Sequence, residues 1–119
     1  MISHVLLWAL LAAPGSSGPH SSAPPPNPNA ARQTFSHCLS GLLKTDLEAK
    51  TAADAFATKA SAACMAEEAA FRAASISADR AVGIRPADAE QNAKSEITDI
   101  RSNALQRYKD YLETNTSPR

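Results

Sequence analysis

The sequence has little of what β-sheets and cofactor-dependent enzymes require. Only 4 of its 119 residues are glycine and only 5% are aromatic. It also lacks the alternating apolar pattern and the Asn-Gly or Asp-Gly turns that mark β-hairpins. Alanine, the strongest helix former, supplies 25 residues. A chain of this length has room for one small domain, and we predict that this domain is all-α.

An excess of charge of either sign is also missing. The chain carries 12 Lys and Arg residues against 12 Asp and Glu residues, whereas domains that bind nucleic acids or anionic membranes usually show a basic excess. Glycine-rich phosphate loops, Cys-x-x-Cys-His haem sites, His-Glu-x-x-His zinc helices and aspartate-rich calcium loops are missing too. We therefore expect no nucleic-acid partner, no membrane-active peptide, no cofactor, no resident metal and no enzyme activity.

The longest apolar run is too short to cross a membrane. It extends over nine residues, Val5 to Ala13, which is the length of a signal-peptide core and about half of a membrane span. The small residues Ala13 and Gly15 suit a signal peptidase. We therefore predict a signal peptide over residues 1–15, a periplasmic or secreted product, and no stable membrane anchor after cleavage. The alternative is a short N-terminal core helix over the same apolar run.

A proline-rich segment follows this run. Six of the eight prolines lie between Pro14 and Ala30, and no Asp, Glu, Lys or Arg precedes Arg32. Such a segment buries too little apolar area to offset its ordering entropy. We predict a disordered linker over residues 16–30, with a proline-rich ligand for an aromatic groove as the alternative.

Apolar residues recur at spacings of three and four from residue 31 to residue 115, which predicts the helical domain; residues 116–119 are expected to be a disordered tail. Three helices, over about 30–44, 52–82 and 86–114, would pack as an up-down-up bundle.

Local signals set these helix boundaries. Thr51 to Asp54 matches a capping box, and Gly83 and Pro86 suit the end of one helix and the start of the next. Thr45 to Glu48 matches the same capping pattern, so an earlier start of the second helix, or a nearly continuous first helix, is the alternative. The spacing predicts these inward-facing residues: Phe35, Cys38, Leu39, Leu42, Leu43, Phe56, Ala60, Ala63, Cys64, Glu67, Phe71, Ala74, Ala78, Ala81, Val82, Ala89, Ala93, Ile97, Ile100, Ala104, Tyr108 and Tyr111.

Cys38 and Cys64 are the only cysteines, and both lie on predicted inward faces. In an exported chain this pair predicts one disulfide, which would stabilise the fold by about 3 to 4 kcal/mol on the chain-entropy model. A redox dithiol would normally show Cys-x-x-Cys at a helix N-terminus. A metal site would need further ligands, for which His20 and His37 are the available histidines. The disulfide is therefore favoured over both.

Glu67 is the only acidic residue on the predicted inward faces. A buried carboxylate must be paired or neutral, which leaves two interpretations. The first is an ion pair inside the bundle with Arg107, and the second is a general acid or ligand-binding carboxylate. We favour the ion pair, because single buried ions in bundles are usually satisfied internally. His37 is predicted on the solvent face, without a nucleophile that would form a catalytic triad.

The pattern Phe35-x-x-Cys38-Leu39, followed by Phe56 and by an alanine-rich approach to Cys64-x-x-Glu67 and Phe71, resembles a class of small exported helical proteins of alphaproteobacteria. The resemblance covers about a third of the chain. It implies a paired Cys38 and Cys64 with Glu67 beside them, and it implies no enzyme activity.

Two functions remain in competition. The first is a non-catalytic exported protein that acts through contact with an unknown protein partner, as an adaptor, an inhibitor or an envelope component. The alternative is a periplasmic binder of a small molecule or metal, with a bundle cavity around Glu67 and Arg107. The alanine-rich face of the second predicted helix also offers a route to a homodimer.

Overall fold

A computed structural model describes residues 26–119, which contain four α-helices and no β-strand. The helices are α1 (Pro28–Glu48), α2 (Ala53–Ala62), α3 (Met65–Ala81) and α4 (Pro86–Thr114). The all-α prediction is confirmed, whereas the predicted number of helices is one too low. The predicted signal peptide lies outside the described residues, as does most of the predicted linker.

Helix α1 begins inside the segment predicted as linker. The side chain of Asn27 accepts hydrogen bonds from the backbone N–H groups of Asn29, at 2.9 Å, and Ala30. Pro28 occupies the first turn, where its missing N–H costs nothing. The last proline of the proline-rich segment therefore starts a helix. At its other end α1 continues to Glu48, four residues beyond the predicted Lys44.

The predicted second helix is broken in two at Cys64. This residue has a left-handed backbone with φ of +61° and is the N-cap of α3, a conformation that costs a non-glycine residue about 1 kcal/mol or more. No glycine or proline marks the position in the sequence, so no local signal predicts the break. By contrast, Gly83, with φ of +89°, and Pro86 separate α3 from α4 as predicted.

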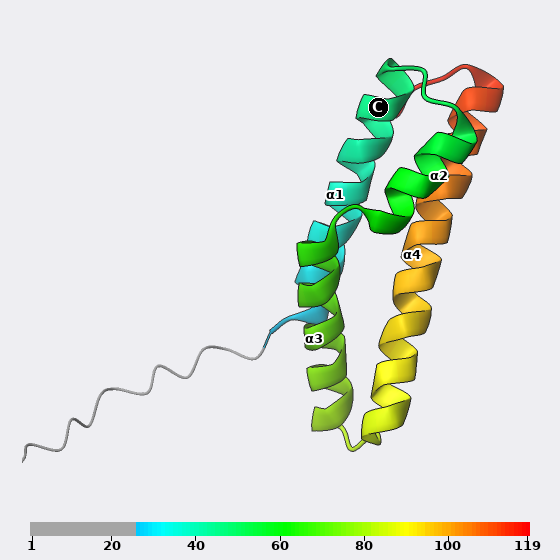
Figure 1. The fold of residues 1–119 in the computed structure, drawn as a ribbon. Helices are drawn as coiled ribbons and strands as arrows, with labels where there is room; N and C mark the ends of the chain where they lie inside the picture. Colours follow the sequence, from blue (N-terminus) through cyan, green and yellow to red (C-terminus); the bar gives the residue numbers. More distant parts are fainter. Residues whose placement is uncertain (1–25) are drawn as a thin grey trace, which may run out of the picture.

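Helices α2 and α3 together fill the place of one helix in a three-helix bundle, each over part of its length. Figure 1 shows α3 beside the N-terminal half of α4 and α2 beside its C-terminal half, with α1 alongside. The core has two parts, one around each of these two helices. The part around α3 contains Phe35, Leu39, Phe71, Ile97 and Ala104, and the part around α2 contains Leu43, Phe56, Ala60 and Tyr108.

Helical periodicity identified most of the core. Twelve of the predicted inward residues are buried: Phe35, Leu39, Leu43, Phe56, Ala60, Phe71, Ala74, Ala89, Ala93, Ile97, Ala104 and Tyr108. Five of these twelve are alanines, which bury little area, so the core needs additional support. Ala81 and Val82 were wrongly placed inward. Both are exposed, Val82 by 78%, because α3 ends at Ala81. Asp46 and Ser75 are buried without having been predicted.

None of the helices between residues 26 and 119 combines the length and the apolar character of a membrane span.

Candidate functional site

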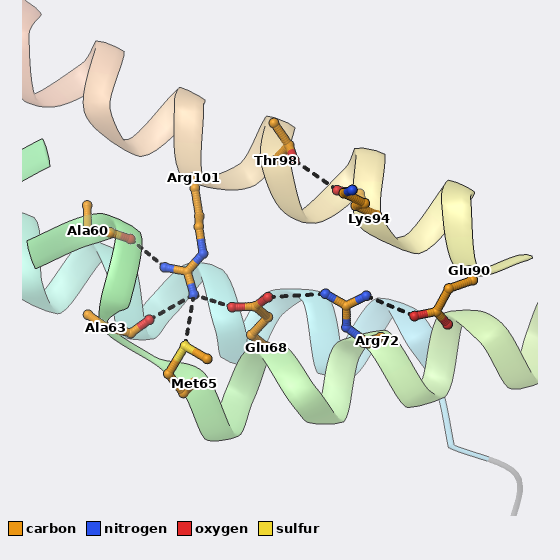
Figure 2. A network of polar contacts seen from close by, with 9 residues as sticks. All are labelled: Ala60, Ala63, Met65, Glu68, Arg72, Glu90, Lys94, Thr98 and Arg101. Carbon is orange, nitrogen blue, oxygen red and sulfur yellow. Dashed lines mark hydrogen bonds and ion pairs between the residues drawn. The ribbon is translucent and has the colours of Figure 1, made fainter. Parts of the chain in front are cut away.

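Arg101 of α4 occupies the point where α2 gives way to α3. Figure 2 shows its guanidinium group reaching from α4 to both helices. One amino group donates to the carbonyl oxygen of Ala60, and the other donates to the carbonyl oxygen of Ala63, at 2.9 Å, and to the Glu68 carboxylate. Carbonyl groups at the end of a helix lack helical partners. Arg101 therefore caps α2 and anchors α3 at the same time.

Glu68 extends this arrangement along α3. Its carboxylate binds Arg101 and also lies 3.4 Å from Arg72, which in turn lies 3.2 Å from Glu90 of α4. The pair of Glu68 with Arg72 has the Glu-before-basic spacing that stabilises helices. Arg101 and Glu68 are each 14% exposed in their side chains. The network is thus a structural clamp whose central charges are satisfied by each other.

Two cation–π contacts with core phenylalanines lie next to the clamp. The guanidinium carbon of Arg101 lies 5.1 Å from the ring centroid of Phe35, and that of Arg32 lies 5.3 Å from the centroid of Phe71. The two rings stack on each other at 6.4 Å. Arg32 also pairs with Glu96. These cation–π contacts join the charged network to the apolar core.

The predicted disulfide is present and lies next to the helix break. Cys38 comes from the middle of α1 and Cys64 from the N-cap of α3, with a sulfur–sulfur bond of 2.02 Å and Cα atoms 6.0 Å apart. A carboxylate oxygen of Glu67 and the two sulfur atoms all lie within 4.8 Å of one another. All three residues are half-buried. The structure therefore brings Glu67 to the disulfide.

The structure does not bring Glu67 to Arg107. Among the ion pairs and hydrogen bonds of residues 26–119, none joins these two side chains. Because the chain turns at Cys64, the acidic residue of α3 that meets α4 is Glu68, and its partner is Arg101. Arg107 is exposed, as is His37, which was predicted on the solvent face. The predicted ion pair therefore does not form.

A second buried polar group, Asp46, was not predicted from the sequence. Asp46 is 2% exposed in the last turn of α1, and its Oδ1 accepts hydrogen bonds of 2.6 Å from Lys59 and from Thr51. These two donors, Lys59 first, hold the pKa of Asp46 below its usual value even though burial opposes ionisation. Its Oδ2 atom is buried without a partner among the described residues. Leu39, Leu43 and Asp46 follow one another at helical spacing, so this spacing was the sequence signal that could have predicted the burial of Asp46.

Tyr108 of α4 completes this cluster. Its hydroxyl donates to the carbonyl oxygen of Thr51 and lies 3.2 Å from that of Asp46, while its ring stacks on Phe56 at 3.9 Å. Burial first, and then the negative charge of Asp46, raise the pKa of Tyr108. The predicted capping box at Thr51 does not form, because the Thr51 hydroxyl binds Asp46 and α2 is left with Ala52 as an N-cap without a side-chain bond.

An open groove runs between α1 and α4. It has a volume of about 460 Å³, and its lining combines apolar residues with small polar ones such as Ser36 and Ser40. Arg107 is the one charged residue in that lining. The clamp residues Arg101 and Glu68 have internal partners, whereas no ion pair or side-chain hydrogen bond in the described part of the chain involves Arg107.

No protein-family profile, curated protein or solved structure matches this chain.

Proposed function

We propose that this protein is a non-catalytic binding module that acts through contact with another protein, and that the groove between α1 and α4 receives a helix of the partner. The observation that carries the proposal is the state of Arg107. No ion pair or side-chain hydrogen bond within residues 26–119 involves this charged side chain, and it lies in a groove whose other lining residues are neutral. The clamp and the Asp46 cluster, by contrast, use their charges within the fold.

The lining of the groove suits an amphipathic helix. Ile100 is half-buried and supplies apolar surface for the partner's apolar face, while the buried Leu39 and Leu43 form the floor of the groove. Ser36 and Ser40 lie one turn apart on α1, and such small side chains allow a neighbouring helix to approach closely. A helix in this position would add a further member to the bundle by ordinary helix packing.

Charge selects the kind of partner. A guanidinium group favours a carboxylate, to which it donates two parallel hydrogen bonds. The partner helix therefore carries Asp or Glu beside its apolar face. A second copy of this chain offers no carboxylate in the equivalent groove, so two grooves placed face to face would leave both Arg107 side chains without a partner. A protein of different sequence therefore fits the groove better than a symmetric, groove-to-groove dimer does.

Export is part of the proposal. Disulfides persist in oxidising compartments, so the bond between Cys38 and Cys64 supports the predicted periplasmic or secreted location. The resemblance to small exported alphaproteobacterial proteins agrees with that location. The alternative function, a cavity around Glu67 and Arg107, has less support, since Glu67 does not line the groove that contains Arg107.

Site-specific photocrosslinking in the source cells tests this function. A photoreactive residue replaces Asn103, which lines the groove, or Ser77, an exposed residue of α3 that serves as the control position. We expect a single protein to be crosslinked from position 103 and not from position 77, with the crosslink on an amphipathic helix. Equal crosslinking from both positions would contradict the proposal.

Charge reversal tests the role of Arg107 in the same assay. We expect Arg107→Glu to weaken the complex by about tenfold or more, because a carboxylate of the partner would then face a like charge. Lys109→Glu makes the same change of charge at an exposed position of α4 outside the groove and is the matched control. Equal crosslink yields from the two variants would remove Arg107 from the interface.

A further inference from the structure

Two cysteines and a carboxylate form a cluster at the start of α3. The ligand atoms of Cys38, Cys64 and Glu67 lie within 4.8 Å of one another, and all three residues are half-buried. Glu67 takes part in none of the ion pairs or side-chain hydrogen bonds found within residues 26–119. In the sequence, His20 and His37 were the only evident further ligands for a metal, so the disulfide was favoured. The fold supplies that ligand from Glu67.

The setting of Cys64 differs from the one that the sequence suggested. Cys64 is the N-cap of α3, and no side chain caps the free amide groups of the first turn. The N-terminus of a helix carries a partial positive charge and is a setting typical of reactive cysteines. In a sequence, a reactive cysteine at a helix N-terminus is normally marked by a Cys-x-x-Cys motif. Here the break between α2 and α3 creates that setting without the motif.

We propose that reduction of the disulfide between Cys38 and Cys64 converts this cluster into a site for a divalent cation of the Zn²⁺ type, with the two thiolates and the Glu67 carboxylate as ligands. Three protein ligands leave one position of a tetrahedral zinc ion for water. Thiolates select such a cation over Mg²⁺ or Ca²⁺. Because both sulfur atoms are needed as ligands, metal binding and the disulfide exclude each other.

The chemical step requires a dithiol reductant that reaches the protein by thiol–disulfide exchange, because an oxidising compartment otherwise preserves the bond. Two electrons from the dithiol break the sulfur–sulfur bond of the protein, and the reductant becomes a disulfide. The reduced cysteines then lose their two thiol protons to solvent when the cation binds. Cys38 and Cys64 remain attached to α1 and α3, and the bond from Arg101 to Ala63 holds the chain immediately before Cys64. The ligands therefore stay near one another after the disulfide opens.

Cobalt binding by the whole chain tests the site. The purified protein is reduced with dithiothreitol, freed of reductant without oxygen, and titrated with Co²⁺ as a spectroscopic substitute for Zn²⁺. We expect a thiolate-to-cobalt charge-transfer band that saturates at one Co²⁺ per chain and disappears when Zn²⁺ is added. The oxidised chain is expected to show no such band. A reduced chain without the band would overturn the proposal.

Variants then identify the ligands. We expect Glu67→Gln to lower the Zn²⁺ affinity of the reduced chain by at least about tenfold, since even residues outside the first coordination shell are worth that much at zinc sites. Glu113→Gln, an exposed change near the end of α4, is the matched control and should leave the affinity unchanged. Equal affinities in these two variants would contradict ligation by Glu67.

Circular dichroism separates loss of the site from loss of the fold. If reduction lowers the helical signal, we expect Zn²⁺ to restore it in the reduced chain and to restore it less well in Glu67→Gln, because metal binding and folding are coupled. A reduced chain that loses its helices and does not regain them with Zn²⁺ would also overturn the proposal.

Discussion

Arg101 of α4 and Glu68 of α3 form an ion pair in which each side chain is only 14% exposed. The same guanidinium group binds the carbonyl oxygens of Ala60 and Ala63. One side chain therefore holds the end of α2, the start of α3 and the middle of α4. The stability of the helix break should depend on it.

We expect Arg101→Ala to lower the free energy of unfolding by about 3 kcal/mol or more, because it leaves the largely buried Glu68 carboxylate without one of its two cationic partners. Arg85→Ala removes an exposed pair with Asp88 and should cost less than about 1 kcal/mol. Urea denaturation followed by circular dichroism measures both changes. Similar losses in the two variants would show that the clamp contributes little.

The disulfide should account for a large part of the total stability. Cys38→Ser combined with Cys64→Ser is expected to lower the free energy of unfolding by about 3 to 4 kcal/mol, since the unfolded chain regains the freedom that the crosslink removes. The comparison is made by denaturation of the oxidised wild-type chain and of the double variant. An unchanged midpoint would contradict the expectation.

Glycine at position 64 should recover part of that loss. The left-handed backbone of Cys64 strains any residue with a Cβ atom, and glycine adopts it freely. We expect Cys38→Ser with Cys64→Gly to be about 1 kcal/mol more stable than the double serine variant. If the serine variant is equally stable, the chain has relaxed at position 64 once the disulfide is absent.

Asp46 should make the fold sensitive to acid. Its pKa is lowered in the folded state, so its contribution to stability is complete above the unfolded value of about 3.9. That contribution is lost as the pH falls through the lower, folded pKa. We expect the urea midpoint to fall in acid, and Asp46→Asn to flatten that fall. Asp54→Asn, at an exposed position, should keep the wild-type profile.

Tyr108 should make the fold sensitive to alkali. Its pKa is raised in the folded state, so its contribution is complete below the unfolded value of about 10 and is lost as the pH rises through the higher, folded pKa. Phenolate absorbance during alkaline titration should show one tyrosine that ionises together with unfolding. We expect Tyr108→Phe to remove that late step and Tyr111→Phe to retain it.

The sequence alone was sufficient for the helical class, for most of the core and for the disulfide. Alanine content and the spacing of residues such as Phe35, Leu39 and Leu43 act within a few turns of helix, so they can be read locally. The two cysteines pair because they are the only ones and lie on inward faces. The spacing of Leu39 and Leu43 also predicts Asp46 as the next inward residue. It was not predicted, because the first helix was expected to end at about Lys44.

The break at Cys64 and the partners of the buried charges belong to the tertiary structure. Local propensity alone favours an unbroken alanine-rich helix. The disulfide from Cys64 to Cys38, 26 residues away, holds the chain in the bent form. The hydrogen bonds from Arg101 to Ala60 and Ala63, which are 41 and 38 residues from it, do the same. That bend pairs Glu68 with Arg101 and places Glu67 beside the sulfur atoms. The packing of α1 beside α4 places Arg107 in the groove. Contacts between helices set these pairings, and residue spacing within one helix does not contain that information.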